Sequence, residues 1–217
     1  MNYLRLLILS LLATAHASAQ IKTEPRCYAW DVGLDLTKLL PITQESGVTL
    51  ETFVYGPIKR DFRWRATVGF ADLNFGTIYS NLYYLTKGYY GKVGISKQFS
   101  NHWELGVNTV YSSYDEVGKV NFAGPIYGNL SFNPKQHQSL WGLELQGDYF
   151  IEIYKHWWLN IQGRLSTILS TVMDDYFSPY YAPGFGNLQI GNEFSSEKER
   201  ANRITIDLSI RAVYRFY

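Results

Sequence analysis

The sequence is poor in cysteine and in charge. Cys27 is the only cysteine among 217 residues, so the chain can form neither an intrachain disulfide nor a cysteine-based metal cage, and we assign Cys27 no role. Charged residues make up 18% of the chain, below the roughly 25% of ordinary globular proteins. The formal net charge is only +1, whereas surfaces that bind nucleic acid are normally strongly basic. We therefore expect no nucleic-acid partner.

Long apolar runs are missing beyond the N-terminus. Residues 1–19 carry Arg5 near the start, an apolar run over 6–15 and the small residues Ala17-Ser18-Ala19, which is the pattern of a cleaved signal peptide. No later stretch approaches the roughly 18 apolar residues that mark a transmembrane helix. We expect residues 20–217 to form one exported domain, and such a domain spans a membrane only as a closed sheet.

Motifs for common chemistry are also absent. The sequence has no Gly-rich phosphate loop, no H-E-x-x-H helix and no EF-hand pattern, so we expect no metal, no cofactor and no enzymatic activity. His102 and His156 fall in segments that we expect to be short turns. His137 lies near Ser131 and Ser139 in a long connection, and a Ser–His pair there is the one arrangement that would hydrolyse a lipid ester.

Alternation of apolar and polar side chains is what the sequence has in abundance. It is clearest over residues 204–217, where the apolar members are Ile204, Ile206, Leu208, Ile210, Ala212, Tyr214 and Phe216. Successive side chains of a strand point to opposite faces, so this segment has one apolar and one largely polar face. Soluble strands are usually about five or six residues long, while a tilted membrane-spanning strand needs roughly ten.

Eight such segments follow the leader, at residues 29–37, 47–55, 62–70, 87–99, 102–114, 139–153, 157–168 and 203–217. The connections after the second, fourth and sixth are short, and those after the third, fifth and seventh are long. This alternation is typical of outer-membrane barrels, with tight periplasmic turns and long outer loops. We predict an all-β fold, a single antiparallel up-and-down transmembrane β-barrel in the bacterial outer membrane. About eight strands are expected, or ten if a long loop holds an extra hairpin.

Aromatic residues make up 17% of the chain, which suits girdles at the two lipid–water interfaces. We expect outer-membrane lipid to contact a girdle formed by Trp30, Trp64, Trp103, Trp141, Trp157, Trp158, Tyr214 and Phe216.

Charges fall on the opposite face of the segments, which would line the lumen. The expected network consists of Asp31, Asp35, Glu51, Arg63, Arg65, Lys92, Glu104, Glu144, Asp148, Arg164, Asp207 and Arg211. Neighbouring segments joined by short turns carry mostly opposite signs, and so do the last and first, so we expect ion pairs between neighbours. Glycines on this face, among them Gly69 and Gly142, are expected to make room for long Arg and Glu side chains. An eight-stranded barrel is just wide enough for side chains to fill, so we predict a plugged lumen.

The segments LTKGYYGKVGISK (85–97), HWWLNIQGRL (156–165) and YAPGFGN (181–187) resemble a poorly characterised family of small outer-membrane barrel proteins from Bacteroidota. The resemblance implies a barrel and carries no catalytic residue. We expect a structural or accessory component that docks another envelope protein through its long loops or its wall. The aromatic, Gly-rich outer loops would either bind that partner or fold over the barrel mouth. A narrow channel for small solutes and, third, a lipid-modifying enzyme are the alternatives.

Overall fold

The computed structural model describes residues 29–39, 46–59, 61–79, 82–124, 128–173, 181–187 and 204–216. The expected signal peptide, Cys27 and Tyr217 lie outside these residues. The barrel strands are β1 (Trp30–Asp35), β2 (Ser46–Lys59), β3 (Phe62–Tyr79), β4 (Leu82–Gln98), β5 (Trp103–Gly124), β7 (Lys135–Tyr154), β8 (Trp157–Met173) and β11 (Ile204–Phe216). The smaller elements are the 3-10 turn η1 (Thr37–Leu39), β6 (Gly128–Phe132), β9 (Tyr181–Ala182) and β10 (Gly186–Asn187). Among the described residues, no helix is long and apolar enough to span a bilayer.

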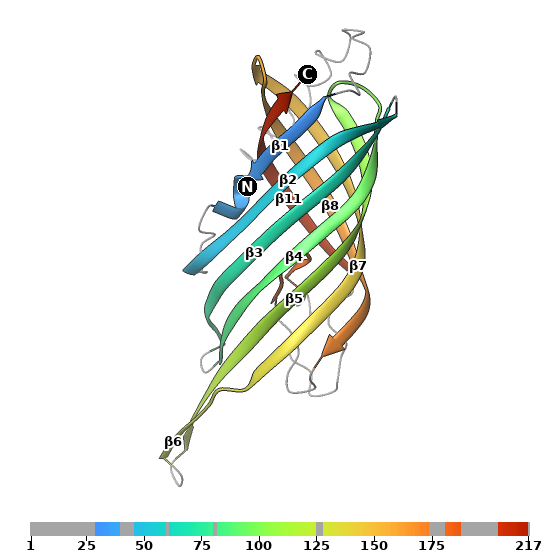
Figure 1. The fold of residues 1–217 in the computed structure, drawn as a ribbon. Helices are drawn as coiled ribbons and strands as arrows, with labels where there is room; N and C mark the ends of the chain where they lie inside the picture. Colours follow the sequence, from blue (N-terminus) through green and yellow to red (C-terminus); the bar gives the residue numbers. More distant parts are fainter. Residues whose placement is uncertain are drawn as a thin grey trace, which may run out of the picture.

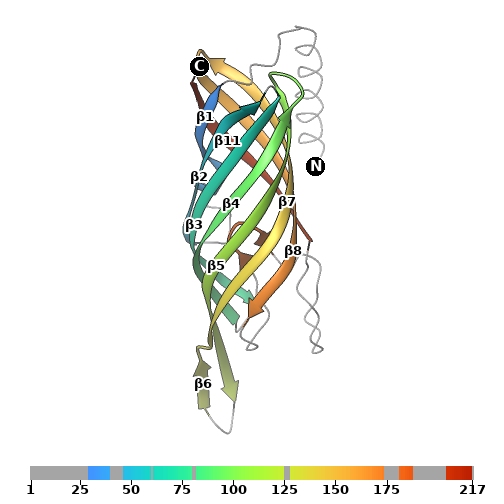
Figure 2. The ribbon, with the colours of Figure 1, turned by 45° about the vertical axis from the view of Figure 1, so that its right-hand side comes forward.

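The sheet closes on itself as an antiparallel barrel (Figures 1 and 2). Each barrel strand pairs with the next along the chain, β5 pairs with β7, and β11 pairs with both β8 and β1. The last strand lies against the first in register, from Trp30 opposite Phe216 to Asp35 opposite Arg211. The prediction of eight antiparallel strands is confirmed. The ten-strand alternative is wrong, because β6 extends beyond the cylinder and pairs with β5 alone among the described strands.

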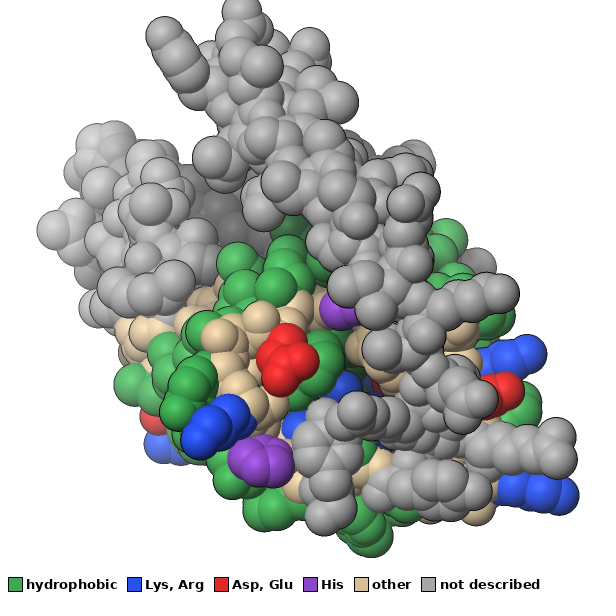
Figure 3. Space-filling model, turned by 90° about the horizontal axis from the view of Figure 1, so that it is seen from above, with side chains coloured by type: hydrophobic (Ala, Val, Ile, Leu, Met, Phe, Trp, Pro, Cys, Tyr) green, Lys and Arg blue, Asp and Glu red, His purple; other side chains and the backbone are tan. Residues whose placement is uncertain are grey.

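Short turns and the chain end share one end of the barrel, at the top of Figure 1. There β2 joins β3, β4 joins β5 and β7 joins β8. Figure 3 looks onto this end and shows basic and histidine side chains lying between hydrophobic ones. At the opposite end the strands are longer than the sequence predicted, because β3, β4, β5 and β7 continue into segments that we expected to be loops.

The loop prediction failed at these segments because the apolar residues end before the strands do. Beyond that level, β7 still alternates exposed and buried side chains from Lys135 onward, but its exposed residues are polar. Pairing continues there because it satisfies the backbone donors and acceptors in water as well as in lipid.

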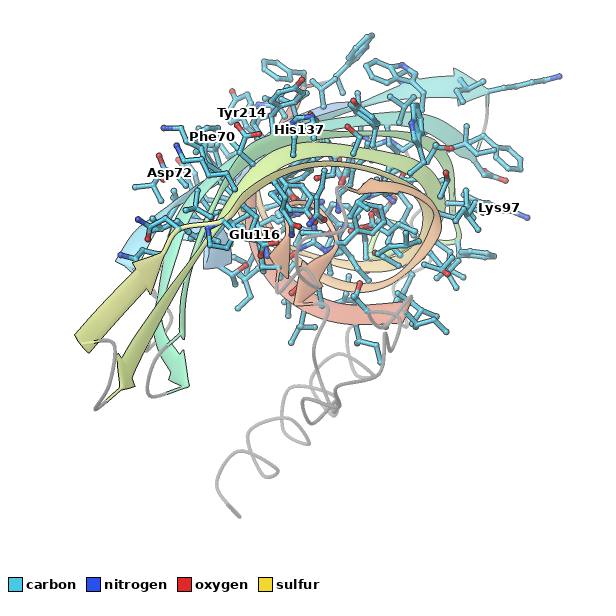
Figure 4. All side chains as sticks on the ribbon, turned by 90° about the horizontal axis from the view of Figure 1, so that it is seen from below. Phe70, Asp72, Lys97, Glu116, His137 and Tyr214 are labelled. Atoms are coloured by element: carbon cyan, nitrogen blue, oxygen red, sulfur yellow. The ribbon has the colours of Figure 1, made fainter. Side chains whose placement is uncertain are left out.

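The wall has an apolar exterior and a polar interior. On β11, the side chains of Ile206 and Leu208 are 77% and 68% exposed, whereas Ser209 and Arg211 are buried. The other strands follow the same two-residue period, with buried and exposed residues alternating along β7. In Figure 4, seen along the barrel axis, Phe70 and Lys97 extend away from the cylinder. The predicted inward and outward faces are therefore confirmed for β11.

Placing a charge in the middle of the wall tests whether the barrel exterior faces lipid. Leu208 lies opposite Gly163, midway along β8 between the two aromatic levels described below. Leu208→Arg should lower the free energy of unfolding from lipid vesicles by about 2–4 kcal/mol, because the guanidinium would enter hydrocarbon. The measurement is urea unfolding followed by tryptophan fluorescence.

Ile58→Arg is the matched control for that experiment. Ile58 is 54% exposed and lies at the end of β2 beside the turn. The same substitution there should cost only about 0–1 kcal/mol. Equal effects at both positions would contradict a lipid-facing wall.

Candidate functional site

The barrel interior holds the greatest concentration of charged side chains. A first group, which we call the turn-end cluster, consists of Asp31, Arg63, Arg65, Glu104, Asp148 and Arg215, all fully or nearly fully buried. Arg215 binds Asp31 with two nitrogens, Nε at 2.7 Å and Nη2 at 2.9 Å. Arg63 Nη1 lies 2.8 Å from the same carboxylate and 3.3 Å from Glu104. Arg65 Nη2 lies 2.8 Å from Asp148.

A second group lies deeper along the axis and is organised by Glu51. This Glu51 cluster consists of Asp35, Glu51, Arg164, Asp207, Arg211 and Lys38. Arg211 and Arg164 both donate to the Glu51 carboxylate, Arg164 at 3.1 Å, and the Tyr90 hydroxyl donates to it at 2.5 Å. Arg164 also binds Asp207, which is partly exposed and pairs with Lys38 on η1 at 3.1 Å. One carboxylate thus joins β2, β4, β8 and β11.

Lys92 and Glu144 form a separate buried pair between β4 and β7, with Nζ 2.5 Å from Oε2. Asn108 donates to the other Glu144 oxygen at 2.9 Å. The twelve charged residues predicted for the lumen therefore all point inward and join ion pairs, together with Arg215 and Lys38.

The predicted partners are mostly wrong, however. Inside the barrel, direct ion pairs between neighbouring strands occur at the β11–β1 closure, as expected, and at Arg164 with Asp207 on β8 and β11. The other ion pairs between strands inside the barrel cross the lumen, among the described residues, and join β3 to β1, β5 and β7, β4 to β7, and β8 to β1 and β2. Register explains this result. Glu51 lies opposite Gly69 rather than an arginine of β3, and Glu104 lies opposite Gln98 rather than Lys92.

Aromatic rings fill the interior between the charges. The Arg65 guanidinium lies 4.0 Å from the centre of the Tyr55 ring, and that of Arg211 lies 4.7 Å from the centre of the Phe53 ring. Such stacking stabilises a desolvated cation by about 2 kcal/mol. These rings were not predicted, because aromatic residues in an outer-membrane chain are expected at the lipid interface.

Trp158 corrects the predicted girdle. It lies inside the barrel at 5% exposure, with its ring 4.3 Å from the Arg215 guanidinium carbon. Adjacent residues of a strand face opposite sides, so Trp157 and Trp158 cannot both be external. The remaining girdle residues are external and cluster mainly at the turn end, where Trp30 meets Trp64 at 5.4 Å and Trp157 meets Tyr214 at 5.1 Å between ring centroids.

A second aromatic level lies toward the opposite end, where Trp141 meets Tyr111 with ring centroids 4.8 Å apart. Tyr111 follows Trp103 of the turn-end level by eight residues along β5. At about 3.3 Å per residue and a tilt near 40°, the two levels lie roughly 20 Å apart along the axis. This spacing is close to the apolar band of about 25 Å found in outer-membrane barrels.

The β9–β10 hairpin enters the barrel from the end opposite the turns (Figures 1 and 2). Ala182 and Phe185 are buried at 0% and 2% exposure and pack against Val110, Tyr114, Leu140 and Ile168. The Thr205 hydroxyl donates to the Phe185 carbonyl at 2.6 Å, which fixes the hairpin to β11. Gly184 and Gly186 have φ angles of +82° and +99°, which favour glycine in this tight turn. The described part of the long connection between β8 and β11 therefore packs into the barrel at the end opposite the turns.

Interior glycines make room chiefly for rings rather than for charged side chains. A Cβ at Gly142 would collide with the Phe185 ring of the hairpin, and one at Gly69 would collide with the Tyr90 ring. Gly106, by contrast, does face a charged side chain, that of Arg65. The expectation that these glycines mainly make room for Arg and Glu side chains was therefore wrong, because the aromatic residues found inside had been predicted on the exterior.

The described histidines lie at the short turns and on the outer face of the wall. His102 Nδ1 lies 2.8 Å from the Phe150 carbonyl and His156 Nδ1 lies 3.0 Å from the Arg215 carbonyl, so both rings are tied to the short turns where they were expected. His137 lies on the exterior of β7 (Figure 4). Within the described residues, no group of three or more His, Cys, Asp or Glu side chains is arranged to hold a metal ion.

Solved structures that are similar to this chain include the two that follow. No protein-family model matches the chain, and a search of curated proteins finds no match. A major outer membrane protein from Thermus thermophilus is similar over 87% of this chain and 98% of its own, at 14% identity and a TM-score of 0.46. The beta domain of the Bordetella autotransporter BrkA has the same coverage and identity, with a TM-score of 0.37. Neither comparison tests the resemblance to the Bacteroidota family, which stays a prediction.

Removing one cation from the Glu51 cluster should destabilise the barrel strongly. Arg211→Met would leave Glu51 and Asp35 with less compensation in a dry interior, and breaking a buried pair in this way costs about 3–5 kcal/mol. We expect a loss of that size in vesicle unfolding, and a lower temperature for the folded-to-unfolded shift on gels.

Lys87→Met is the control, because Lys87 and Asp72 form an ion pair whose side chains are 66% and 51% exposed. Removing an exposed pair costs about 0–1 kcal/mol. The double variant Glu51→Gln/Arg211→Met should recover part of the loss. A single variant as stable as Lys87→Met would show that the interior pairs do not hold the barrel together.

Proposed function

We propose that this protein is an integral outer-membrane barrel with a closed lumen that docks another envelope protein at its outer end. The observation that carries this proposal is the combination of a filled interior with an extended arm of strands beyond the wall. The apolar exterior and the two aromatic levels support the membrane location.

The closed interior favours docking over transport. Two clusters of buried ion pairs, the rings stacked on them and the β9–β10 hairpin occupy the lumen along its axis. A solute would have to break several buried pairs to pass, at several kcal/mol each. The narrow-channel alternative therefore has no support in the geometry.

The outer arm offers an open sheet edge. β4 pairs with β5 only as far as Val120, and β7 pairs with β5 only as far as Val117. Beyond these residues β5 pairs with β6 from Val120 to Gly124, so the tip is a two-stranded ribbon among the described strands (Figure 1). Exposed edges carry backbone groups that can pair with an added strand. The partner that fits this feature is an envelope protein with an extended segment.

Site-specific crosslinking distinguishes the arm from the wall. A photo-crosslinking amino acid at Asn129, on the β6 edge of the tip, should capture one defined partner in intact cells. The same amino acid at Val93, which is 66% exposed in the lipid-facing wall, is the control and should capture lipid. A partner captured at Val93 alone would move docking to the wall, and uncrosslinked monomer at both positions would contradict the proposal.

Electrical recording tests the closed lumen. The refolded protein should give no conductance steps in a planar bilayer, because the ion pairs and the hairpin leave the interior filled. Correct insertion is checked by the heat-dependent shift on a gel and by a conducting barrel in the same membrane. Reproducible steps that change when Arg164 is neutralised would establish the channel instead.

A further inference from the structure

A row of four polar side chains crosses the exterior of the wall near its outer end. Asp72 of β3, Lys87 of β4, Asp115 of β5 and His137 of β7 are direct neighbours in register. Lys87 Nζ lies 2.8 Å from Asp72, and His137 Nδ1 lies 2.8 Å from Asp115. All four side chains are more than half exposed. Charged groups in this position belong at the level of lipid headgroups.

Ser113 lies one step closer to the membrane than this row. It follows the exterior face of β5, two residues before Asp115, and lies opposite Tyr89 of β4 and Ser139 of β7. The aromatic pair of Tyr111 and Trp141 follows two residues further in. Ser113 thus lies between the charged row and the aromatic level. In a lipid leaflet, that depth is where ester groups join headgroups to acyl chains.

Ser113, His137 and Asp115 are in contact in the order of a nucleophile, a base and an orienting acid. Ser113 Oγ lies 3.4 Å from His137 Nε2, and Asp115 Oδ1 accepts from His137 Nδ1 at 2.8 Å. The second bond places the proton on Nδ1 and leaves the Nε2 lone pair facing the serine. A serine–histidine distance slightly above the usual range is common before substrate binds. Sequence proximity had suggested Ser131 or Ser139 instead.

We propose that Ser113, His137 and Asp115 form a catalytic triad that hydrolyses a fatty acyl ester of an outer-leaflet lipid. This activity is independent of the docking function proposed above. The strands hold all three residues on the lipid-facing exterior, so the substrate reaches them from within the leaflet. Ser113 itself is only 5% exposed, so an ester group reaches its hydroxyl once neighbouring exterior side chains move aside, and exposed side chains change rotamer within nanoseconds.

The reaction follows the chemistry of serine acyl transfer. Ser113 Oγ attacks the ester carbonyl carbon while its proton moves to His137 Nε2. The tetrahedral intermediate then expels the lipid alcohol, which takes that proton and leaves an acyl ester on Ser113. Water, deprotonated by His137, cleaves the acyl ester and releases the fatty acid. The net change is ester plus water to alcohol plus fatty acid, with no other reactant.

The charge that develops on the carbonyl oxygen needs hydrogen-bond donors. Backbone amides at this level are engaged in the β4–β5–β7 ladder, so side chains must provide them. Ser139, directly opposite Ser113, and Lys87, directly opposite Asp115, are the donors that flank the triad in register. Lys87 also suits the phosphate of a lipid headgroup.

The test uses the full mature chain, refolded and incubated with mixed micelles of either a diacyl phospholipid or lipid A. Fatty acid release is followed by mass spectrometry, and a fluorophosphonate probe reports covalent labelling of Ser113 as a mass increase. We expect release from one of the two lipids, which identifies the source of the ester. Ser113→Ala and His137→Gln should lower release at least about 100-fold, and Asp115→Asn should also lower it strongly.

Ser112→Ala is the matched control, because Ser112 is the adjacent residue on the buried, lumen-facing side of β5. It should keep both release and probe labelling. Each variant is checked for the heat-dependent gel shift, so that loss of folding is not read as loss of catalysis. Release that persists in Ser113→Ala, or a folded wild-type barrel that neither takes the probe nor releases fatty acid from either lipid, would overturn the proposal.

Discussion

The buried carboxylate of Glu51 is the constraint on which the rest of the structure depends. A carboxylate at 0% exposure is tolerated only when cations and donors surround it, and Arg211, Arg164 and Tyr90 supply them from three other strands. Closure of the barrel brings these strands together, and their pairing in turn makes closure favourable. The same logic holds at the turn end, where Asp31 receives Arg215 from the last strand and Arg63 from β3. Backbone hydrogen bonds alone do not specify the register between the first and last strands of the sheet. The ion pairs between them do.

A filled interior and an apolar exterior are two consequences of one period-two pattern, but they tolerate different substitutions. The exterior needs only apolar side chains of any shape, since lipid adapts to them. The interior needs matched charges, rings of the right size and glycines where rings pass, as at Gly142 beneath Phe185. The β9–β10 hairpin, which carries Phe185, caps this interior at the end opposite the turns. Beyond the last ion pairs, apolar residues of β5, β7 and β8 form a small dry core, and the hairpin completes it.

The sequence allowed the strand number, the closing strand and the inward set of charges to be predicted, because each follows from alternation within one segment. It did not allow the partners to be predicted, because register depends on turns and on the whole cylinder. Glu51 reaches Arg164 across 113 residues, and no local pattern relates them. Trp158 was predicted on the wrong face although parity alone excludes it, since the expected girdle rested on composition rather than on geometry. The serine beside His137 was missed because Ser113 is 24 residues away and becomes a neighbour only through pairing of β5 with β7.

Hydrogen bonds on the interior face of the β5–β7 pair lie at the same level as the exterior triad, and they affect how it is positioned. Inside, the Tyr114 hydroxyl donates to Gln138 at 2.5 Å, and the Gln136 amide donates to Glu116 at 3.1 Å. Outside, between these residues along the strands, Asp115 meets His137. Interior hydrogen bonds thus hold the register that aligns the exterior residues, and sites built on strands are positioned more precisely than sites on loops. A serine, a histidine and an aspartate held in line by a rigid wall need no loop to order them, because β5 and β7, two of the eight barrel strands, set the distances between the reacting groups.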